Sequence, residues 1–146
     1  STFFEEIHSI DKGPPPDVNL ANEKNNGNMV LNLINEKLVS SVHDISSGGL
    51  ILALAEMAIP SNYGLLIDRP KKLSNLFEYF FGEDQGRYLI EVDQKNLEKV
   101  KSFLKDGNIY NETVATVQKD YFEIKGELKI HIKDLFKVNN KWYNSY

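Results

Sequence analysis

The chain has 146 residues and no cysteine, so it is long enough to bury one core but has no disulfide framework, thiolate zinc site or cysteine nucleophile. Its net charge of −4 gives no electrostatic reason to bind nucleic acid or an anionic membrane, and no run of about 18 apolar residues is present. These features indicate a soluble domain, and the lack of cysteine fits a reducing, cytoplasmic compartment.

The first part of the chain is predicted to be a linker. Residues 1–22 contain three consecutive prolines, which exclude a helix interior or a central strand, so we expect a short aromatic element followed by an extended segment. The domain itself is expected over 23–146, and it begins with a predicted helix over 23–38. The expected buried face of that helix carries Val30, Leu33, Ile34 and Leu38.

The middle of the chain combines strands with an unusually apolar helix. Residues 38–44 are predicted to form a strand, and 49–59 a helix whose only charged residue is Glu56. A helix that is apolar nearly all round is expected to be covered on most sides. Pro60 is expected to end this helix, and another strand is predicted over 63–68.

A second alternation of helix and strand follows. We predict a short helix over 71–80 and a strand over 87–92, whose lack of alternation predicts burial on both faces. Asp93 is expected to cap a helix that runs to about Lys105. The apolar stripe of this last helix is Leu97, Val100, Phe103 and Leu104.

Strands dominate the C-terminal part. Strand-like stretches cover 113–117, 121–124 and 128–132, with a hairpin turn at Gly126, and a helical turn is expected at 134–136. The aromatic residues of the tail, expected to pack against the domain or a neighbour, are Trp142, Tyr143 and Tyr146. We therefore expect an α+β fold in which a single mixed β-sheet is packed with α-helices.

The loop between strand 38–44 and helix 49–59 is the first candidate site. A serine can cap the helix, and two glycines allow bare backbone amides to approach a ligand at the positive end of the helix dipole. Such a loop predicts a site for a substrate or a phosphate. Adjacent residues on a strand point to opposite faces, so only one of the histidine and aspartate before the loop need face the ligand. The candidate binding residues are His43, Asp44, Ser46, Gly48 and Gly49.

The same loop has a purely structural interpretation. Ser46 or Ser47 would be only a cap, the glycines would permit close packing of the helix, and the histidine and aspartate would form a local pair. Neither the P-loop spacing nor GxGxxG is present, so the residues alone leave both interpretations open.

The stretch FFGEDQGRYLIEV, 80–92, is the second candidate. Its turn gathers Glu83, Gln85 and Arg87, which either line a ligand cleft or only fix the turn through a charge-assisted pair between Arg87 and Glu83. His8 and His131 lack the spacing of metal ligands, so we predict no metal site and assign no catalytic residue.

Nearly the whole chain resembles the C-terminal, AIR synthase-related domain in the synthetase subunit of the phosphoribosylformylglycinamidine synthase family. The resemblance is carried, in chain order, by GPPPDVNLANE, LINEKLVSSVHDISSGGLILALAEMAI and FGEDQGRYLIEV. The pairing of HD-x-S-x-GGL with FGE-x-QGR separates this family from related synthetases. Two positions depart from the family, which usually has aspartate where this chain has Asn19 and Ser47.

The resemblance implies part of an ATP-dependent ligase of purine biosynthesis, which converts formylglycinamide ribonucleotide to formylglycinamidine ribonucleotide with ammonia from glutamine. It implies ATP and Mg²⁺ in the complete enzyme, none for this chain itself, and a last domain that is inactive alone. The expected partners are the N-terminal ATP-binding domains of the same polypeptide and, in the short form, a glutaminase subunit and a small accessory subunit. The alternatives are a structural or interaction domain, or the matching domain of another ATP-dependent synthetase. The cleft that the domain borders is either active or degenerate.

Overall fold

The computed structural model describes residues 1–70 and 75–141, and the chain divides into two compact units. Unit 1 comprises Ser1–Ala53 and Phe77–Glu112, and unit 2 comprises Leu54–Leu76 and Thr113–Tyr146. Each unit is therefore assembled from two separate segments of the chain.

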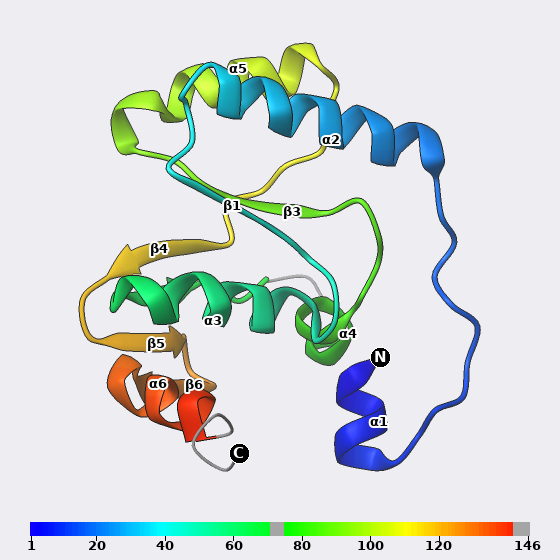
Figure 1. Ribbon diagram of the computed structural model, residues 1–146, viewed down its shortest axis with the longest axis vertical. Helices are drawn as coiled ribbons and strands as arrows, with labels where there is room; N and C mark the ends of the chain where they lie inside the picture. The colour runs from blue at the N-terminus through cyan, green and yellow to red at the C-terminus, as the bar shows by residue number, and fades with distance from the viewer. Residues whose placement is uncertain (71–74, 142–146) are drawn as a thin grey trace. The chain divides into compact units, whose positions relative to one another are not determined.

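Unit 1 is mainly helical, with one small sheet (Figure 1). Its elements are α1 (Thr2–His8), α2 (Leu20–Asn35), β1 (Ser41–Asp44), the start of α3 (Gly49–Ser61), most of α4 (Leu76–Phe81), β3 (Tyr88–Glu91), the 3₁₀ turn η1 (Gln94–Asn96) and α5 (Leu97–Asp106). Strands β1 and β3 are antiparallel, with Ser41 opposite Glu91 and Asp44 opposite Tyr88. This pairing brings the two candidate stretches of the sequence to the same end of one sheet.

The core of unit 1 lies between α2 and α5, which run side by side (Figure 1). Its buried side chains are Leu33, Leu38, Val100 and Leu104, with Met29, Val39, Ile90, Val92, Phe103 and Ile109 packed around them. The predicted apolar faces of both helices are thus largely confirmed. Ile34 departs from the prediction because it is 45% exposed, and Val30 and Leu97 are only partly buried.

Helix α2 starts three residues before the predicted 23–38 helix and ends at Asn35. The earlier start has a local cause, since the side chain of Asn19 accepts a hydrogen bond of 3.0 Å from the amide of Asn22. Asn19 therefore performs the capping role that an aspartate could also fill.

Unit 2 is built on a mixed four-stranded sheet. Its elements are the rest of α3, β2 (Gly64–Ile67), β4 (Ala115–Gln118), β5 (Tyr121–Ile124), β6 (Leu128–His131) and α6 (Ile132–Lys141). The strand order is β4-β2-β5-β6, with β2 and β5 parallel and the other neighbours antiparallel. The predicted hairpin at Gly126 is confirmed as the β5–β6 turn.

The α+β class with a mixed sheet is confirmed, but the described strands lie in two sheets rather than in the single sheet we expected. Strand β3 belongs to the two-stranded sheet, so the prediction that it is buried on both faces is wrong. Leu89 is 8% exposed, whereas its neighbour Tyr88 is 36% exposed. In the apolar run YLI only Leu89 is buried, as expected of a strand with one covered face and not of a central strand.

Several predicted boundaries also shift. Pro60 lies inside α3, which reaches Ser61, and α6 has ten residues instead of a single turn. Asp93 makes no capping hydrogen bond with its side chain and precedes η1. Residues 71–74 of the helix predicted over 71–80 lie outside the described residues, as do Trp142, Tyr143 and Tyr146. None of the described helices is long and apolar enough to cross a membrane.

Candidate functional site

The loop from Asp44 to Gly49 connects β1 to α3 and is fixed mainly by its backbone. The amide of Ile45 donates to the carbonyl of Arg87 over 2.9 Å, which prolongs the β1–β3 ladder by one bond. The amide of Gly49 donates to the carbonyl of Ser46 over 3.0 Å and so closes the turn. The side chains of Ser46 and Ser47 are left exposed at the tip of this turn.

Gly49 is required where the loop meets α4. Its φ is +70°, and a Cβ atom at this position would lie 2.7 Å from the carbonyl oxygens of both Phe80 and Gly82. No L side chain fits there without moving backbone, so Gly49 allows the end of α4 to approach the loop. This contact supports the structural interpretation of the second glycine.

Glu83 occupies the position in which we expected a ligand. Its Oε1 accepts the amide of Gly48 at 2.9 Å and the amide of Thr2 at 2.7 Å. Desolvation by burial would raise the pKa of the Glu83 carboxyl, but the hydrogen bonds from Gly48 and Thr2 outweigh it and hold the pKa below its usual value. The ionised carboxylate of Glu83 therefore accepts the hydrogen bond of this loop amide.

The expectation that Gly48 and Gly49 present bare donors to a ligand is consequently wrong for this structure. Both residues are buried, and both amides already donate to acceptors of the protein. The two glycines shape the loop, and the polar groups of its tip belong to Ser46 and Ser47. Among the described residues, the amides and hydroxyls of these two serines have no acceptor in the protein.

His43 and Asp44 differ in their positions. The imidazole Nδ1 of His43 lies 2.6 Å from the carbonyl oxygen of Asp44 and 3.8 Å from its carboxylate, and its side chain is 30% exposed. Asp44 is 67% exposed and lines a pocket that His43 does not line. Of the two, Asp44 is therefore the one that lines the pocket.

The turn between α4 and β3 is held by Arg87, but not through the partner we expected. Its Nη2 donates to the carbonyl of Gly82 at 2.6 Å, and its Nε to the carbonyl of Asp84 at 3.3 Å. The guanidinium also pairs with the carboxylate of Asp84 at 3.5 Å. The predicted pair between Arg87 and Glu83 is thus replaced by these bonds, because Glu83 turns toward the amides of Gly48 and Thr2.

The two candidate stretches meet in one pocket of about 360 Å³ in unit 1. Its walls come from α2, from the β1–α3 loop and from the α4–β3 turn. The lining residues are Glu23, Asp44, Ile45, Ser46, Ser47, Glu83, Gln85, Gly86, Arg87 and Tyr88. Of the residues predicted from sequence, Asp44, Ser46, Glu83, Gln85 and Arg87 are present in this pocket, whereas His43, Gly48 and Gly49 are not.

Five lining residues were not among the predicted site residues: Glu23, Ile45, Ser47, Gly86 and Tyr88. Glu23 reaches the pocket because α2 packs closely on the turn at Gly86, where an added Cβ would lie 3.3 Å from the Cα of Glu23. The side-chain amide of Asn26 donates to the carbonyl of Gly86 at 2.9 Å and fixes this approach. Tyr88 enters as the first residue of β3. The local sequence around Glu23 or Tyr88 does not predict a place in the pocket, because that place depends on how α2 packs on the turn.

The pocket is polar and carries more negative than positive charge. It contains the carboxylates of Glu23, Asp44 and Glu83 against the single guanidinium of Arg87. Within the described ranges there is no group of three or more histidine, aspartate or glutamate side chains that could hold a metal ion. The arrangement offers hydroxyl, amide and guanidinium donors beside carboxylate acceptors.

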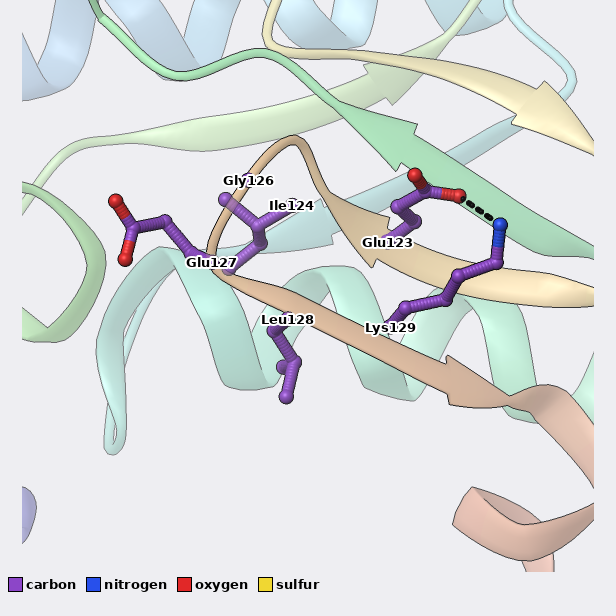
Figure 2. A pocket seen from close by; sticks show the side chains of 6 residues that line it. All are labelled: Glu123, Ile124, Gly126, Glu127, Leu128 and Lys129. Carbon is purple, nitrogen blue, oxygen red and sulfur yellow. Dashed lines mark ion pairs between the residues drawn. The ribbon is translucent and has the colours of Figure 1, made fainter.

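A second hollow, of about 250 Å³, lies on the β5–β6 hairpin of unit 2. Figure 2 shows Glu123 and Lys129 facing each other across the two strands, and their ion pair is 2.9 Å long. Glu127 pairs with Arg69 at 2.8 Å. The charges of this hollow thus have partners in the protein, and none of the predicted site residues lines it.

Comparison with known proteins identifies relatives of the whole chain. Residues 2–125 match the family described as AIR synthase related protein, C-terminal domain. The phosphoribosylformylglycinamidine synthase subunit PurL of Pelagibacter ubique is 41% identical over 146 residues, which are 100% of this chain and 20% of that protein. The chain thus spans about one fifth of the length of this curated relative.

Solved structures of PurL from Thermotoga maritima share the fold. The protein complexed with FGAR aligns with a TM-score of 0.67 and 18% identity, covering 78% of this chain and 21% of that chain. The protein complexed with ATP gives 0.66 and 17%, covering 77% and 21%. The PurLQS structure gives 0.67 and 17%, covering 91% and 24%.

Proposed function

This chain belongs to the AIR synthase related protein, C-terminal domain family, and we propose that it works as one domain of a phosphoribosylformylglycinamidine synthase. Such an enzyme uses ATP and ammonia from glutamine to convert formylglycinamide ribonucleotide to formylglycinamidine ribonucleotide. The proposal is supported by the 41% identity to PurL, which extends over the entire chain. In this proposal residues 23–146 form the family domain within a larger polypeptide, and 1–22 connect it to other domains.

The pocket of unit 1 is the part that we assign to ligand binding. The observation that carries this assignment is the meeting of two stretches, far apart in the sequence, whose polar side chains line one cavity. Ser46 and Ser47 supply hydroxyl and amide donors for a phosphate, and Arg87 adds a guanidinium. Asp44 accepts hydrogen bonds from ribose hydroxyls or from an amide of the ligand. Gly48 and Gly49 hold the loop in shape instead of contacting the phosphate.

Electrostatics limit what this pocket does by itself. Three carboxylates against one guanidinium repel a phosphate dianion, so the isolated chain is expected to bind it weakly. Additional donors would have to come from the rest of the polypeptide, and phosphoryl transfer depends on such positioning and charge neutralisation. The isolated chain is therefore expected to be catalytically silent.

ATP and Mg²⁺ belong to the complete enzyme in this proposal. The T. maritima PurL complexed with ATP supports nucleotide binding in an enzyme of this fold. The described residues do not fit a Mg²⁺ site, because the needed cluster of carboxylates is absent among them. The metal ligands and most nucleotide contacts are accordingly assigned to the N-terminal ATP-binding domains.

The partners follow from the same assignment. The closest functional partners would be the N-terminal domains of the same polypeptide, and the PurLQS structure supports an assembly with further subunits. In the short form of the enzyme these are a glutaminase and a small accessory subunit, in the cytoplasm. The alternative is a structural domain whose pocket binds nothing, for which changes in the pocket would alter stability alone.

Kinetics of the full-length enzyme decide between these two roles. Arg87→Lys keeps the charge but removes the planar fork, and Arg69→Lys is the matched control, since Arg69 pairs with Glu127 on unit 2. We expect Arg87→Lys to raise the KM for formylglycinamide ribonucleotide about tenfold or more when KM is measured well below the Tm, with little change for Arg69→Lys. Some loss of Tm is expected as well, because Arg87 also holds the α4–β3 turn. Equal KM values for both variants, or a loss of Tm that accounts for the effect, would favour the structural domain.

A further inference from the structure

A single carboxylate oxygen ties the N-terminal helix to the pocket loop. Oε1 of Glu83 accepts the amide of Thr2, the first residue of α1, and the amide of Gly48 in the β1–α3 loop. Glu83 itself lines the pocket. Any movement of α1 therefore changes the hydrogen bonding of a pocket wall and of the loop beside it.

Helix α1 is attached by few contacts. Its seven residues include none that is buried, and a helix of this length is marginal in isolation. The ring of Phe3 stacks on Phe81 of α4 at 4.0 Å and on Phe77 at 5.5 Å. Phe4 and Ile7, by contrast, are 41% and 65% exposed. The aromatic stack and the bond from Thr2 to Glu83 are thus the main anchors of α1.

The segment that follows α1 leaves it free to move. Residues 9–19 have no regular secondary structure, are exposed throughout and include the three consecutive prolines (Figure 1). Such a proline-containing stretch acts as a semi-rigid spacer rather than as a packed element. Helix α1 can consequently leave α4 without unfolding α2.

We propose that α1 is a strap whose docking on α4 favours ligand binding in the pocket, through Glu83. While α1 is docked, the charge of Glu83 is compensated by two amide donors and the loop is held at Gly48. When α1 leaves, Glu83 loses the Thr2 donor, and its carboxylate faces the pocket with less compensation, held only by its bond to Gly48. A less compensated carboxylate repels a phosphate more strongly.

The coupling is reciprocal. If docked α1 raises the affinity of the pocket for a ligand, the bound ligand must stabilise the docking of α1 by the same factor. This regulatory role rests on the proposed function, because it assumes a phosphate-bearing ligand in the pocket. The mechanical part of the proposal, in which α1 acts on Gly48 through Glu83, does not depend on any ligand.

The mechanical part is tested in the 146-residue chain without ligand. Phe3→Ala removes the stack, and Ile7→Ala, at an exposed position of the same helix, is the control. We expect amide hydrogen exchange at Gly48, followed by NMR, to accelerate about tenfold in Phe3→Ala and to stay unchanged in Ile7→Ala. Equal exchange rates at Gly48 in the two variants would overturn the proposal that α1 acts as a strap.

A second variant distinguishes the loss of the Glu83 hydrogen bonds from a general loss of structure. Glu83→Gln keeps an acceptor oxygen but removes the charge, so exchange at both Gly48 and Thr2 should accelerate while the amides of α5 do not change. Faster exchange at Gly48 without any change at Thr2 would contradict the claim that both amides donate to the same oxygen of Glu83.

The regulatory part is tested in the full-length enzyme. Phe3→Ala should raise the KM for formylglycinamide ribonucleotide several-fold, with Ile7→Ala unchanged. If Gly48 exchange responds to Phe3→Ala but KM does not, the strap does not regulate the pocket. If Arg87→Lys also leaves KM unchanged, the proposed function itself fails, and the two failures are thereby distinguished.

Discussion

The amide of Gly48 donates to the carboxylate of Glu83 over 2.9 Å, although the two residues lie on different loops. The first glycine of the loop before α3 thus has its negatively charged partner inside the protein. The anion that a helix N-terminus attracts is here a side chain from the α4–β3 turn. The stability of the pocket loop should accordingly depend on Glu83.

Removing the acceptor should therefore destabilise the chain. Glu83→Ala leaves the buried amide of Gly48 without its charged partner, and we expect a loss of about 2 kcal/mol in the free energy of unfolding. Denaturant unfolding measures this loss. Glu98→Ala is the control, because the side chain of Glu98 is 88% exposed and should contribute less than about 0.5 kcal/mol. Similar losses for both variants would show that the Gly48–Glu83 bond carries little stability.

The contribution of Glu83 should also depend on pH. The pKa of its carboxyl lies below the ordinary 4.5, so its stabilising effect is present above pH 4.5 and is lost as the pH falls through the lower pKa of the folded state. The difference in unfolding free energy between the native chain and Glu83→Gln should thus shrink on acidification below pH 4.5. A difference that stays constant between pH 7 and pH 3 would exclude the ionised carboxylate as its source.

The two glycines with similar backbone conformations should respond differently to alanine. Gly49→Ala places a Cβ atom 2.7 Å from two carbonyl oxygens, so we expect a loss of about 3 kcal/mol or more. Gly126 has φ +78° and no atom within 4 Å of the added Cβ, so its alanine variant should lose only about 1 kcal/mol. Thermal unfolding of both variants checks this, and equal Tm shifts would mean that the loop and α4 are not in contact.

Tyr79 provides a prediction at alkaline pH. Burial, and then the hydrogen bond of 2.8 Å from its hydroxyl to Glu112, raise the pKa of Tyr79 above the usual tyrosine value. A raised pKa stabilises the folded chain below pH 10 and ceases to do so as the pH rises further, because the unfolded state then ionises first.

The phenolate absorbance of the native chain should therefore show a component that titrates late, and Tyr79→Phe should remove it. Tyr63→Phe, at a position that is 54% exposed, should leave it in place. A late component that survives Tyr79→Phe would assign it to another tyrosine.

Periodicity predicted most of the elements correctly, because burial of one face leaves a repeating pattern in the sequence. The faces of α2 and α5 that carry Leu33, Val100 and Leu104 form the core, as their spacing indicated. The pattern failed for β3, since YLI looks the same in a central strand and in a two-stranded sheet. The number of sheets depends on long-range pairing, which a local pattern does not contain.

The sequence predicted part of the pocket lining but not the hydrogen bonds of its loop. Ser46, Gln85 and Arg87 do meet in one pocket. The amide of Gly48, however, binds Glu83 and not a ligand, because the α4–β3 turn brings a carboxylate onto the loop. Glu23 was missed for the same reason, since only the packing of α2 on Gly86 carries it to the pocket.

The central claim is that the pocket between the β1–α3 loop and the α4–β3 turn receives the phosphate of a ribonucleotide. A crystal structure of the full-length enzyme with formylglycinamide ribonucleotide tests it most directly. We expect the ligand phosphate within about 3 Å of the amides or hydroxyls of Ser46 and Ser47, with the Arg87 guanidinium beside it. A phosphate bound elsewhere in the enzyme, with only solvent beside these serines, would contradict the account.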